Sequence, residues 1–413
     1  MEQIITGLDI GTTKVCAVEA IRNNDEIEII GVGIQPCKGL SRGVIINVEE
    51  TVEAINEAIT EADIQAGHIT EELYVGVAGS HIHGQNSSGI IVNSSKNREI
   101  TENEIERVVN QAQSIKIPNE REIIHVLPWE FIIDEQGGIK DPTGMSGQRL
   151  ESKVHIVTGS VTSIQNLVNS VRSSNYAVKD VVLEPLASAE AVLREEEKEM
   201  GVILIDIGGG TTDVCVFING SLRYTFVIPL GGNNITKDIS ILLKTPYAEA
   251  ERLKTQMGYA FAKNINEAET IQIGGVIGSK IREVSRKFLS EIIQARIEEI
   301  FSMVFEKLQS YKIFDKTVAG VVLTGGTALT EGIVDIGELI FDTHIRVGMP
   351  YGVTGLIDRV HTPICSTAVG LSIWGMREET EYEDDNINRI DDEDGFLYRI
   401  KSGMKNIAKE FFS

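Results

Sequence analysis

The chain has few cysteines, an excess of acids over bases and no long apolar run. Its four cysteines form no CxxC pair, which favours a reduced, cytoplasmic setting. Lysine and arginine number 38 against 61 acids, and this balance argues against nucleic acid as a partner. No apolar run approaches the ~18 residues of a membrane-spanning helix. The start, MEQIITGLDIG, lacks the basic and apolar regions of a secretory signal, so none is expected.

A pattern of three short strands occurs twice in the sequence. The first two strands are joined by GTT in one copy and by GGGTT in the other. Helical patterns at 48–64 and 163–176 follow the strands, so we expect two related α/β halves. The expected strands are 3–9, 14–20 and 26–34 in the first copy, and 202–207, 213–219 and 221–227 in the second.

Two insertions and an acidic segment interrupt this pattern. Residues 80–160 alternate short strands with one helix at 101–115, which is typical of an inserted subdomain. Residues 240–315 are mainly helical, with one helix expected to begin at Thr245 as N-cap and Pro246 as first residue. From Glu378 to Asp394 ten acids face one base, and this composition predicts a disordered linker.

Two strand ends carry residues suited to phosphate binding. In DIGTTK (9–14) a glycine and two hydroxyl residues follow an aspartate, so backbone N–H groups and hydroxyls can meet an anion. In DIGGGTTD (206–213) three glycines allow a ligand to approach the backbone. Asp9 and Asp206 could then face each other and hold a hydrated Mg²⁺ beside the phosphates. The alternative is that both aspartates only cap turns.

A third glycine turn occurs in VVLTGGTALTEG (321–332). A hydrophobic strand there runs into Gly325 and Gly326, and a helix is expected from Thr330. Paired glycines at such a turn let a flat group such as a purine lie against the backbone. An ordinary strand-to-helix loop is the competing interpretation.

These three motifs, in this order and with apolar helices at 183–193 and 365–374, resemble the actin-like ATPase superfamily. No GxxxxGK[ST] pattern is present, and no GxGxxG opens a helix after the first strand. The segments GSHIHGQNSSGIIV, EIIHVLPWEFIIDEQGG and GGNNITKDIS are similar to the FtsA family of bacterial cell-division proteins. The likeness covers about 7–374 and resumes in the tail.

The resemblance implies an α/β, actin-like fold with two ribonuclease-H-like halves around a nucleotide cleft. An α+β subdomain would be inserted in the first half and a mainly helical insertion in the second. The expected division is 1–80 with 160–200 for the first core subdomain, 81–159 for its insert, 201–240 with 316–376 for the second core subdomain, 241–315 for the helical insertion, 377–394 for the acidic linker and 395–413 for a membrane-targeting helix.

The resemblance also assigns ATP and Mg²⁺ as cofactors and carries roles to individual residues. Glu184 stands where many actin-like ATPases orient the attacking water, although it could equally be an acid stabilised at a helix N-terminus. ATP hydrolysis, slow or absent, is therefore a hypothesis. The implied binding residues are Gly11, Thr12, Thr13 and Lys14 in the first phosphate loop, Gly208, Gly209, Gly210, Thr211 and Thr212 in the second, Gly325, Gly326 and Thr327 in the adenosine loop, and Glu251 and Lys254 beside the nucleoside.

A long helix expected at 284–308 carries an apolar stripe that most simply packs in the core. In FtsA-like proteins this region receives the C-terminal peptide of the tubulin-like division protein FtsZ. Lys287 and Arg296 are the contacts we expect from the resemblance.

The last nineteen residues, 395–413, carry four bases and one acid. As a helix they predict a segment lying in the membrane interface, since most of the apolar side chains share an arc of about 100°. A helix docked on the body is the alternative, which the acidic linker disfavours. The apolar positions are Phe396, Leu397, Ile400, Met404, Ile407 and Phe411, with Phe412 just beyond, and the basic positions are Arg399, Lys401, Lys405 and Lys409.

Together with the amphipathic tail, the resemblance implies an ATP-controlled adaptor on the cytoplasmic face of the cell membrane at the division septum. It would polymerise with itself, tether FtsZ to an anionic membrane surface and help recruit later division proteins. The competing hypotheses are a small-molecule kinase or other ATPase of the same fold, and a pilus-assembly adaptor of related architecture.

Overall fold

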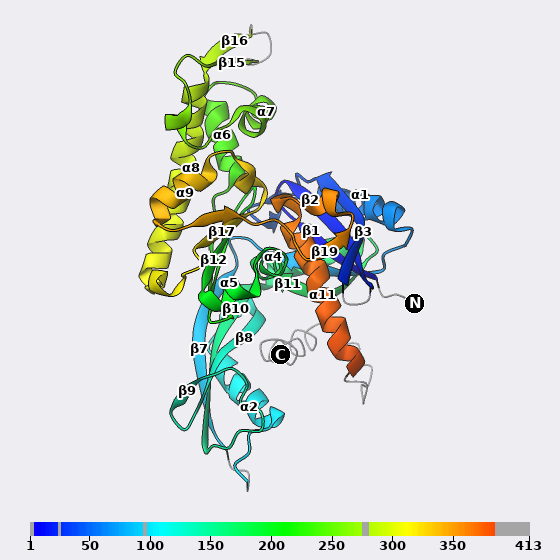
Figure 1. Cartoon of the computed structure of the whole chain (residues 1–413). Helices are drawn as coiled ribbons and strands as arrows, with labels where there is room; N and C mark the ends of the chain where they lie inside the picture. Colours follow the sequence, from blue (N-terminus) through cyan, green and yellow to red (C-terminus); the bar gives the residue numbers. More distant parts are fainter. Residues whose placement is uncertain (1–3, 24–25, 94–96, 275–280, 385–413) are drawn as a thin grey trace.

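The computed structural model describes residues 4–23, 26–93, 97–274 and 281–384. Two large sheets form the centres of two halves, and a third sheet forms a separate insert (Figure 1). The segment 395–413 and the rest of the acidic linker from residue 385 lie outside the described residues.

The first half is built on a six-stranded sheet. Strands β1, β2 and β3 are joined antiparallel, whereas β6, β11 and β19 pair parallel to their neighbours. The order across the sheet is β11 (Ala177–Leu183), β6 (Glu72–Val77), β1 (Ile4–Ile10), β2 (Lys14–Asn23), β3 (Glu26–Pro36) and β19 (Val353–Gly355). The helices of this half are α1 (Val48–Ala66), α3 (Val161–Ser173), α4 (Glu184–Val192) and α11 (Ser366–Asp384), and a short hairpin joins β4 (Leu40–Ser41) to β5 (Val44–Ile45).

Close helix packing holds this sheet between two layers. A Cβ on Gly33 of β3 would lie 1.8 Å from the carbonyl oxygen of Ala58 in α1, so α1 rests directly on the strand. On the other face α11 packs against β1 and α4, and a Cβ on Gly370 would lie 1.8 Å from the carbonyl oxygen of Ala187. These close backbone contacts therefore fix the position of α4 and α11 relative to the strands.

The second half has a five-stranded sheet between α4 and a helical part. Alternate residues of β12 enter different cores: Leu204 packs with the first half, and Ile203 packs with the helices of the second. The strands in order are β14 (Ser221–Ile228), β13 (Thr212–Ile218), β12 (Val202–Ile207), β17 (Val321–Thr324) and β18 (Ile345–Val347). The helices are α5 (Glu195–Met200), α6 (Gly232–Leu242), α7 (Tyr247–Met257), α8 (Arg286–Tyr311), α9 (Ile333–Phe341) and α10 (Ile357–Val360), and β15 (Thr270–Ile273) pairs with β16 (Arg282–Ser285).

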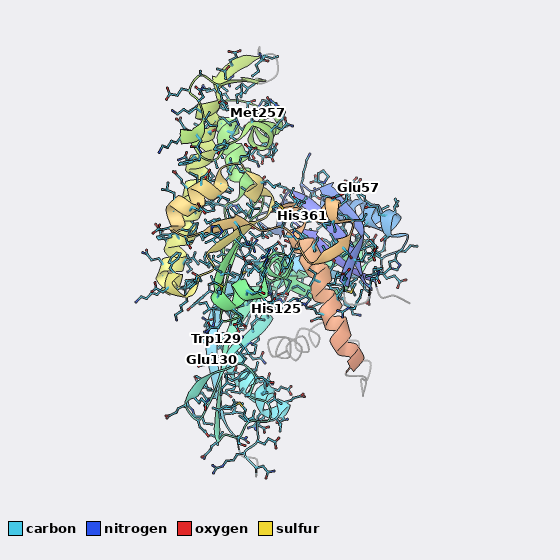
Figure 2. The ribbon with its side chains drawn as sticks, viewed as in Figure 1. Glu57, His125, Trp129, Glu130, Met257 and His361 are labelled. Carbon is cyan, nitrogen blue, oxygen red and sulfur yellow. The ribbon has the colours of Figure 1, made fainter. Side chains whose placement is uncertain are left out.

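The insert leaves the first half after β6 and lies at the opposite end of the molecule from β15 and β16 (Figure 1). Its sheet follows the order β7 (His83–Val92), β10 (Arg149–Ser160), β8 (Arg121–Ile133) and β9 (Gln136–Ile139), with α2 (Glu102–Gln113) packed on β7 and β10. Figure 2 shows His125, Trp129 and Glu130 along β8, where the insert adjoins the body. The Arg223 guanidinium from β14 stacks 3.5 Å from the centre of the Trp129 ring, so the insert also contacts the second half.

Three sequence expectations differ from the structure at helix ends. Helix α7 has Pro246 as its N-cap, because the Thr245 hydroxyl donates to the Gly274 carbonyl at 2.6 Å instead of capping. Helix α9 begins after Gly332, because the Thr330 hydroxyl donates to the Thr327 carbonyl in a short 3₁₀ turn. The predicted disorder of 378–394 is wrong for residues 378–384, which continue α11 and are rich in glutamate, a good helix former.

The chain also returns to the first half near its C-terminal end. Strand β19 pairs with β3, and α11 packs on β1, although 316–376 was expected to belong to the second half. Arg377 of α11 and Glu190 of α4 form an ion pair that ties the two helices together. Among the described residues, no helix has both the length and the apolar character needed to cross a bilayer.

Candidate functional site

A cavity of about 590 Å³ lies between the two halves, and the predicted loops line it. The first-half lining is Asp9, Ile10, Gly11, Thr12, Thr13, Lys14, Gly43, Ala78 and Glu184, with Pro363, Ile364 and Thr367 from the segment that enters α11. The second-half lining includes Asp206, Gly208, Gly209, Gly210, Thr211, Asp213, Gly232, Asn233, Glu251, Lys254, Arg286, Gly325, Gly326, Thr327, Thr330 and Glu331. Its size is ordinary for a small-molecule site.

The first turn, between β1 and β2, is closed by an ion pair. The Lys14 ammonium lies 2.5 Å from the Asp9 carboxylate, and the Gly11 N–H donates to the Lys14 carbonyl. Although burial favours the neutral amine, the neighbouring Asp9 holds the pKa of Lys14 above its ordinary value. The pair leaves the Thr12 and Thr13 hydroxyls and the turn backbone at the cavity wall.

The second turn, between β12 and β13, carries two buried acids. Burial raises the pKa of Asp206 to about 6, although a hydrogen bond of 2.9 Å from the Ser188 hydroxyl opposes the rise. Burial likewise raises the pKa of Asp213 to about 7. The Thr211 hydroxyl donates to Asp213 Oδ2 at 2.8 Å, and Asp213 Oδ1 is buried without a hydrogen bond of ordinary length in the described part of the chain.

The two turns approach each other closely across the cavity. A Cβ on Gly209 would lie 2.4 Å from Thr13 Cγ2, and a Cβ on Gly210 would lie 2.6 Å from Thr12 Oγ1. Side chains at these glycines would therefore separate the halves. Asp9 of the first turn and Asp206 and Asp213 of the second turn line one cavity.

Glu184 is the first residue of α4 and lines the cavity between the two turns. Burial raises its pKa well above the ordinary value, and the charges of Asp9, Asp213 and Asp206 add to the rise. The carboxyl is therefore poised to take up a proton, and a cation beside the acids would return it to the ionised form that a base requires.

The third loop, which follows β17 and holds Gly325 and Gly326, lines the same part of the cavity as α7. The Cβ position of Gly232 is 2.5 Å from Thr327 Oγ1 and 3.4 Å from Lys254 Nζ. The Thr327 hydroxyl donates to the Gly208 carbonyl at 3.2 Å, so the third loop is tied to the second turn. In α7 the Lys254 ammonium lies 2.8 Å from the Glu251 carboxylate, and both residues line the cavity. Gly325 has φ 83° and its Cβ would meet Asp206 Oδ1 at 2.3 Å, so only glycine suits this position.

One expected nucleotide-binding residue, Thr212, does not line this cavity, and the two expected peptide contacts lie elsewhere, on α8. The Thr212 side chain is buried, and its hydroxyl donates to the Leu230 carbonyl at 2.9 Å. Lys287 and Arg296 lie on α8, which packs in the core as its apolar stripe predicts. Lys287 pairs with Glu267 at 2.6 Å, and Arg296 pairs with Asp238 at 2.7 Å.

Several lining residues were missed from the sequence. Asp213 had a usable signal, because aligning GTTKVC with GTTDVC places it where Lys14 stands. Arg286 and Asn233 gave no such signal, since each reaches the cavity only through the packing of its helix.

The residues present fit a nucleotide polyphosphate with a divalent cation. Glycine turns from both halves expose their backbone to the cavity, and six carboxylates in the lining would repel phosphates without a cation. Within the described ranges no three His, Cys, Asp or Glu side chains gather as a metal-ligand set. A cation held beside Asp9 and Asp206 would therefore complete its coordination with phosphate oxygens and water.

Two family models and a group of curated relatives match this chain. The family model described as "Cell division protein FtsA" matches residues 203–370, and the model of the SHS2 domain inserted in FtsA matches 79–158, the insert. The cell division protein FtsA of Pseudomonas aeruginosa is 44% identical over 380 residues, which cover 92% of this chain and 91% of that protein.

Solved structures share the fold at low identity. A chain of the PilM–PilN type IV pilus biogenesis complex superposes with a TM-score of 0.67 at 15% identity, covering 90% of this chain and 98% of that one. MreB5 of Spiroplasma citri bound to ADP superposes with a TM-score of 0.55 at 14% identity, covering 93% and 99%. The expected actin-like fold is thus confirmed, and the chain belongs to the FtsA family of bacterial cell-division proteins.

Proposed function

We propose that the protein binds ATP with Mg²⁺ in the cavity between its halves, and that this binding controls its assembly on the cell membrane. One observation carries the proposal: the glycine turns of both halves line a single cavity, together with Asp9 and Asp206. A polyphosphate held by both turns would link the halves, because each turn belongs to a different sheet.

The rest of the cavity suits the nucleoside. The third loop presents the Gly325 and Gly326 backbone to a flat base, and the Glu251–Lys254 pair of α7 lies at the same end. The carboxylate and ammonium offer an acceptor and a donor to ribose hydroxyls. The ADP bound to the structurally similar MreB5 supports a nucleotide in this fold.

Equilibrium binding of ATP to the full-length protein tests this function. We expect one ATP per chain when Mg²⁺ is present and much weaker binding when EDTA removes it, since the lining acids then repel the phosphates. The affinity for GTP, measured in the same way, tests whether the site selects the adenine base. A protein that binds no adenine nucleotide at millimolar concentration would exclude the function.

We propose that residues 395–413 attach the protein to an anionic membrane surface as an amphipathic helix. The four basic residues of this segment would each contribute about 1 kcal/mol near an anionic leaflet. One such helix binds reversibly, and self-assembly of the body would strengthen attachment by presenting many helices at once. The attached protein would lie on the cytoplasmic face of the membrane, at the division septum where its family acts.

Flotation with vesicles tests the membrane segment separately from ATP binding. The full-length protein should float with vesicles containing anionic lipid and remain at the bottom with neutral ones. A variant ending at residue 394 should bind ATP normally and lose flotation. Flotation of that shortened variant would show that another surface binds the membrane.

We propose that the protein tethers FtsZ through its C-terminal peptide at α8 and helps recruit later division proteins. Lys287 and Arg296 retain partial exposure, with 31% and 23% of their side chains accessible, so a peptide carboxylate can compete with Glu267 and Asp238. The Lys287→Ala/Arg296→Ala variant should bind FtsZ about tenfold more weakly in a pull-down titration. Lys307→Ala, on the same helix, is the matched control, and an equal loss there would remove the assignment.

A further inference from the structure

A two-residue hairpin turn carries an arginine beside Gly43, a residue that lines the cavity, and so places this arginine at the cavity rim. Ser41 pairs with Val44 across the β4–β5 hairpin, so Arg42 and Gly43 alone form the turn. Their φ angles are 51° and 73°, as a type I′ turn requires. Asparagine, aspartate or glycine adopts the first of these positions most readily, so arginine is an unfavourable choice for the turn itself.

The tip of this hairpin is held between the first turn, which joins β1 to β2, and the second turn, which joins β12 to β13. The Gly43 N–H donates to Thr12 Oγ1 at 3.2 Å, which ties the tip to the first turn. The N and Cα atoms of Arg42 lie 3.0 Å from the Cβ position of Gly210 in the second turn. The Ser80 N–H donates to the Arg42 carbonyl at 3.4 Å, where the chain enters the insert. Contacts with three separate segments thus fix the position of the Arg42 backbone.

The hairpin tip and the third loop contact different residues of the second turn. In the second turn Gly208 contacts the third loop through the Thr327 hydroxyl, whereas Gly210 contacts the hairpin. A nucleotide whose base rests on the third loop would therefore extend its phosphates toward Gly210 and the hairpin. The group nearest Arg42 would be the phosphate farthest from the base.

The cations that line the cavity already have carboxylate partners. Lys14 pairs with Asp9, Lys254 pairs with Glu251, and the Arg286 guanidinium lies 2.8 Å from Glu269. The Arg42 side chain is exposed, and in the described part of the chain it forms no ion pair or hydrogen bond. It is thus a cation at the rim whose charge no neighbouring carboxylate neutralises.

We propose that Arg42 contacts the terminal phosphate of a bound nucleoside triphosphate and makes the site distinguish a triphosphate from a diphosphate. The planar guanidinium can donate two parallel hydrogen bonds to one phosphate, which a compact ammonium cannot. The inference rests on the nucleotide binding proposed above. It adds a phosphate-contacting residue from outside the first and second turns.

The test compares ATP and ADP affinity in the full-length protein with Mg²⁺. Arg42→Asn removes the guanidinium and suits the turn, so the fold should remain intact and its thermal midpoint should not fall. We expect ATP to bind about tenfold or more weakly, because a hydrogen bond to a charged group is lost, while the Kd for ADP changes less than about threefold. The Arg42→Lys variant should bind ATP more tightly than Arg42→Asn but more weakly than the unaltered protein.

Arg98→Asn is the matched control, because Arg98 also has a left-handed backbone, with φ 54°, and lies in the insert away from the cavity. This control should leave both affinities unchanged. Equal weakening of ATP and ADP by Arg42→Asn, or no weakening of either, would overturn the inference while ATP binding itself stands. Failure of the unaltered protein to bind either nucleotide would instead overturn the proposed function.

Discussion

The two halves close the cavity with related turns that end on opposite charges. GTTK in the first half ends on Lys14, which pairs with Asp9, whereas GGGTTD in the second half ends on Asp213, an acid buried beside Asp206. The first turn is thus neutralised internally. The second has a longer glycine segment and accumulates negative charge, and a cation or a proton must balance it.

This difference suggests separate tasks for the two turns. Loss of one partner of the ion pair in the first turn should cost stability whether or not a ligand is bound, because the other charge stays buried. The acids of the second turn cost stability when ionised, and a bound cation would recover that cost. Ligand binding should therefore change the second half more than the first, and substitutions in each turn can separate the two contributions.

Lys14→Met should give the largest effect, measured as unfolding in urea without nucleotide. The substitution leaves Asp9 buried without its partner, and we expect a loss of about 3 kcal/mol in the free energy of unfolding. The Asp9→Asn/Lys14→Met variant removes the stranded charge and should recover much of that loss. A single variant as stable as the unaltered protein would show that the pair does not hold the first turn.

Asp213→Asn should act through pH in the second turn. The folded-state pKa of about 7 lies above the ordinary 3.8, so the folded protein keeps a proton that the unfolded chain has released. Protonated Asp213 therefore makes its full contribution to the free energy of unfolding below about pH 4, and this contribution is lost as the pH rises through 7. Relative to the unaltered protein, Asp213→Asn should gain on the order of 2 kcal/mol between pH 5 and pH 8 in urea unfolding. If the difference in unfolding free energy between the two proteins were the same at pH 5 and pH 8, the assigned pKa would be contradicted.

Glu184→Gln should slow phosphate release from bound ATP by about a hundredfold if the carboxyl positions the attacking water. Glutamine keeps the size of the side chain and removes the base, so ATP affinity should remain within a few-fold. Single-turnover measurement of phosphate separates the two quantities. Equal rates in the two proteins would leave Glu184 with only a structural role at the start of α4.

Thr327→Val and Thr12→Val should give the smallest effects. Each removes one hydrogen bond that ties a phosphate turn to a neighbouring segment, Thr327 to Gly208 and Thr12 to Gly43. Each loss should cost about 1 kcal/mol in thermal or urea unfolding. A much larger cost for Thr327→Val would indicate that the third loop, more than the helices, positions the second turn.

The strands and the main loops could be predicted from sequence because they combine local patterns with turn residues. Strand β12 has the limits that its apolar run predicts, and the glycine turns line one cavity. Helix ends were less predictable, because the Thr245 and Thr330 hydroxyls bind carbonyls elsewhere instead of capping.

Features that depend on tertiary packing had no local signal. Strand β19 is three residues long and is defined only by its pairing with β3. The cavity-lining position of Arg286 depends on how α8 meets α7, and no spacing in the sequence shows that contact. The Lys14–Asp9 pair was also missed, because the turn motif alone suggests that both residues face a ligand.

The most direct measurement is the affinity for ATP with Mg²⁺ of two variants, each of which adds one methyl group to one of the two turns. Gly11→Ala and Gly208→Ala place a Cβ no closer than 3.1 Å and 3.4 Å to other protein atoms, so both variants should fold. If one polyphosphate occupies both turns, each methyl group should weaken ATP binding by about tenfold or more. Loss in only one variant, or in neither, would contradict a ligand shared between the halves.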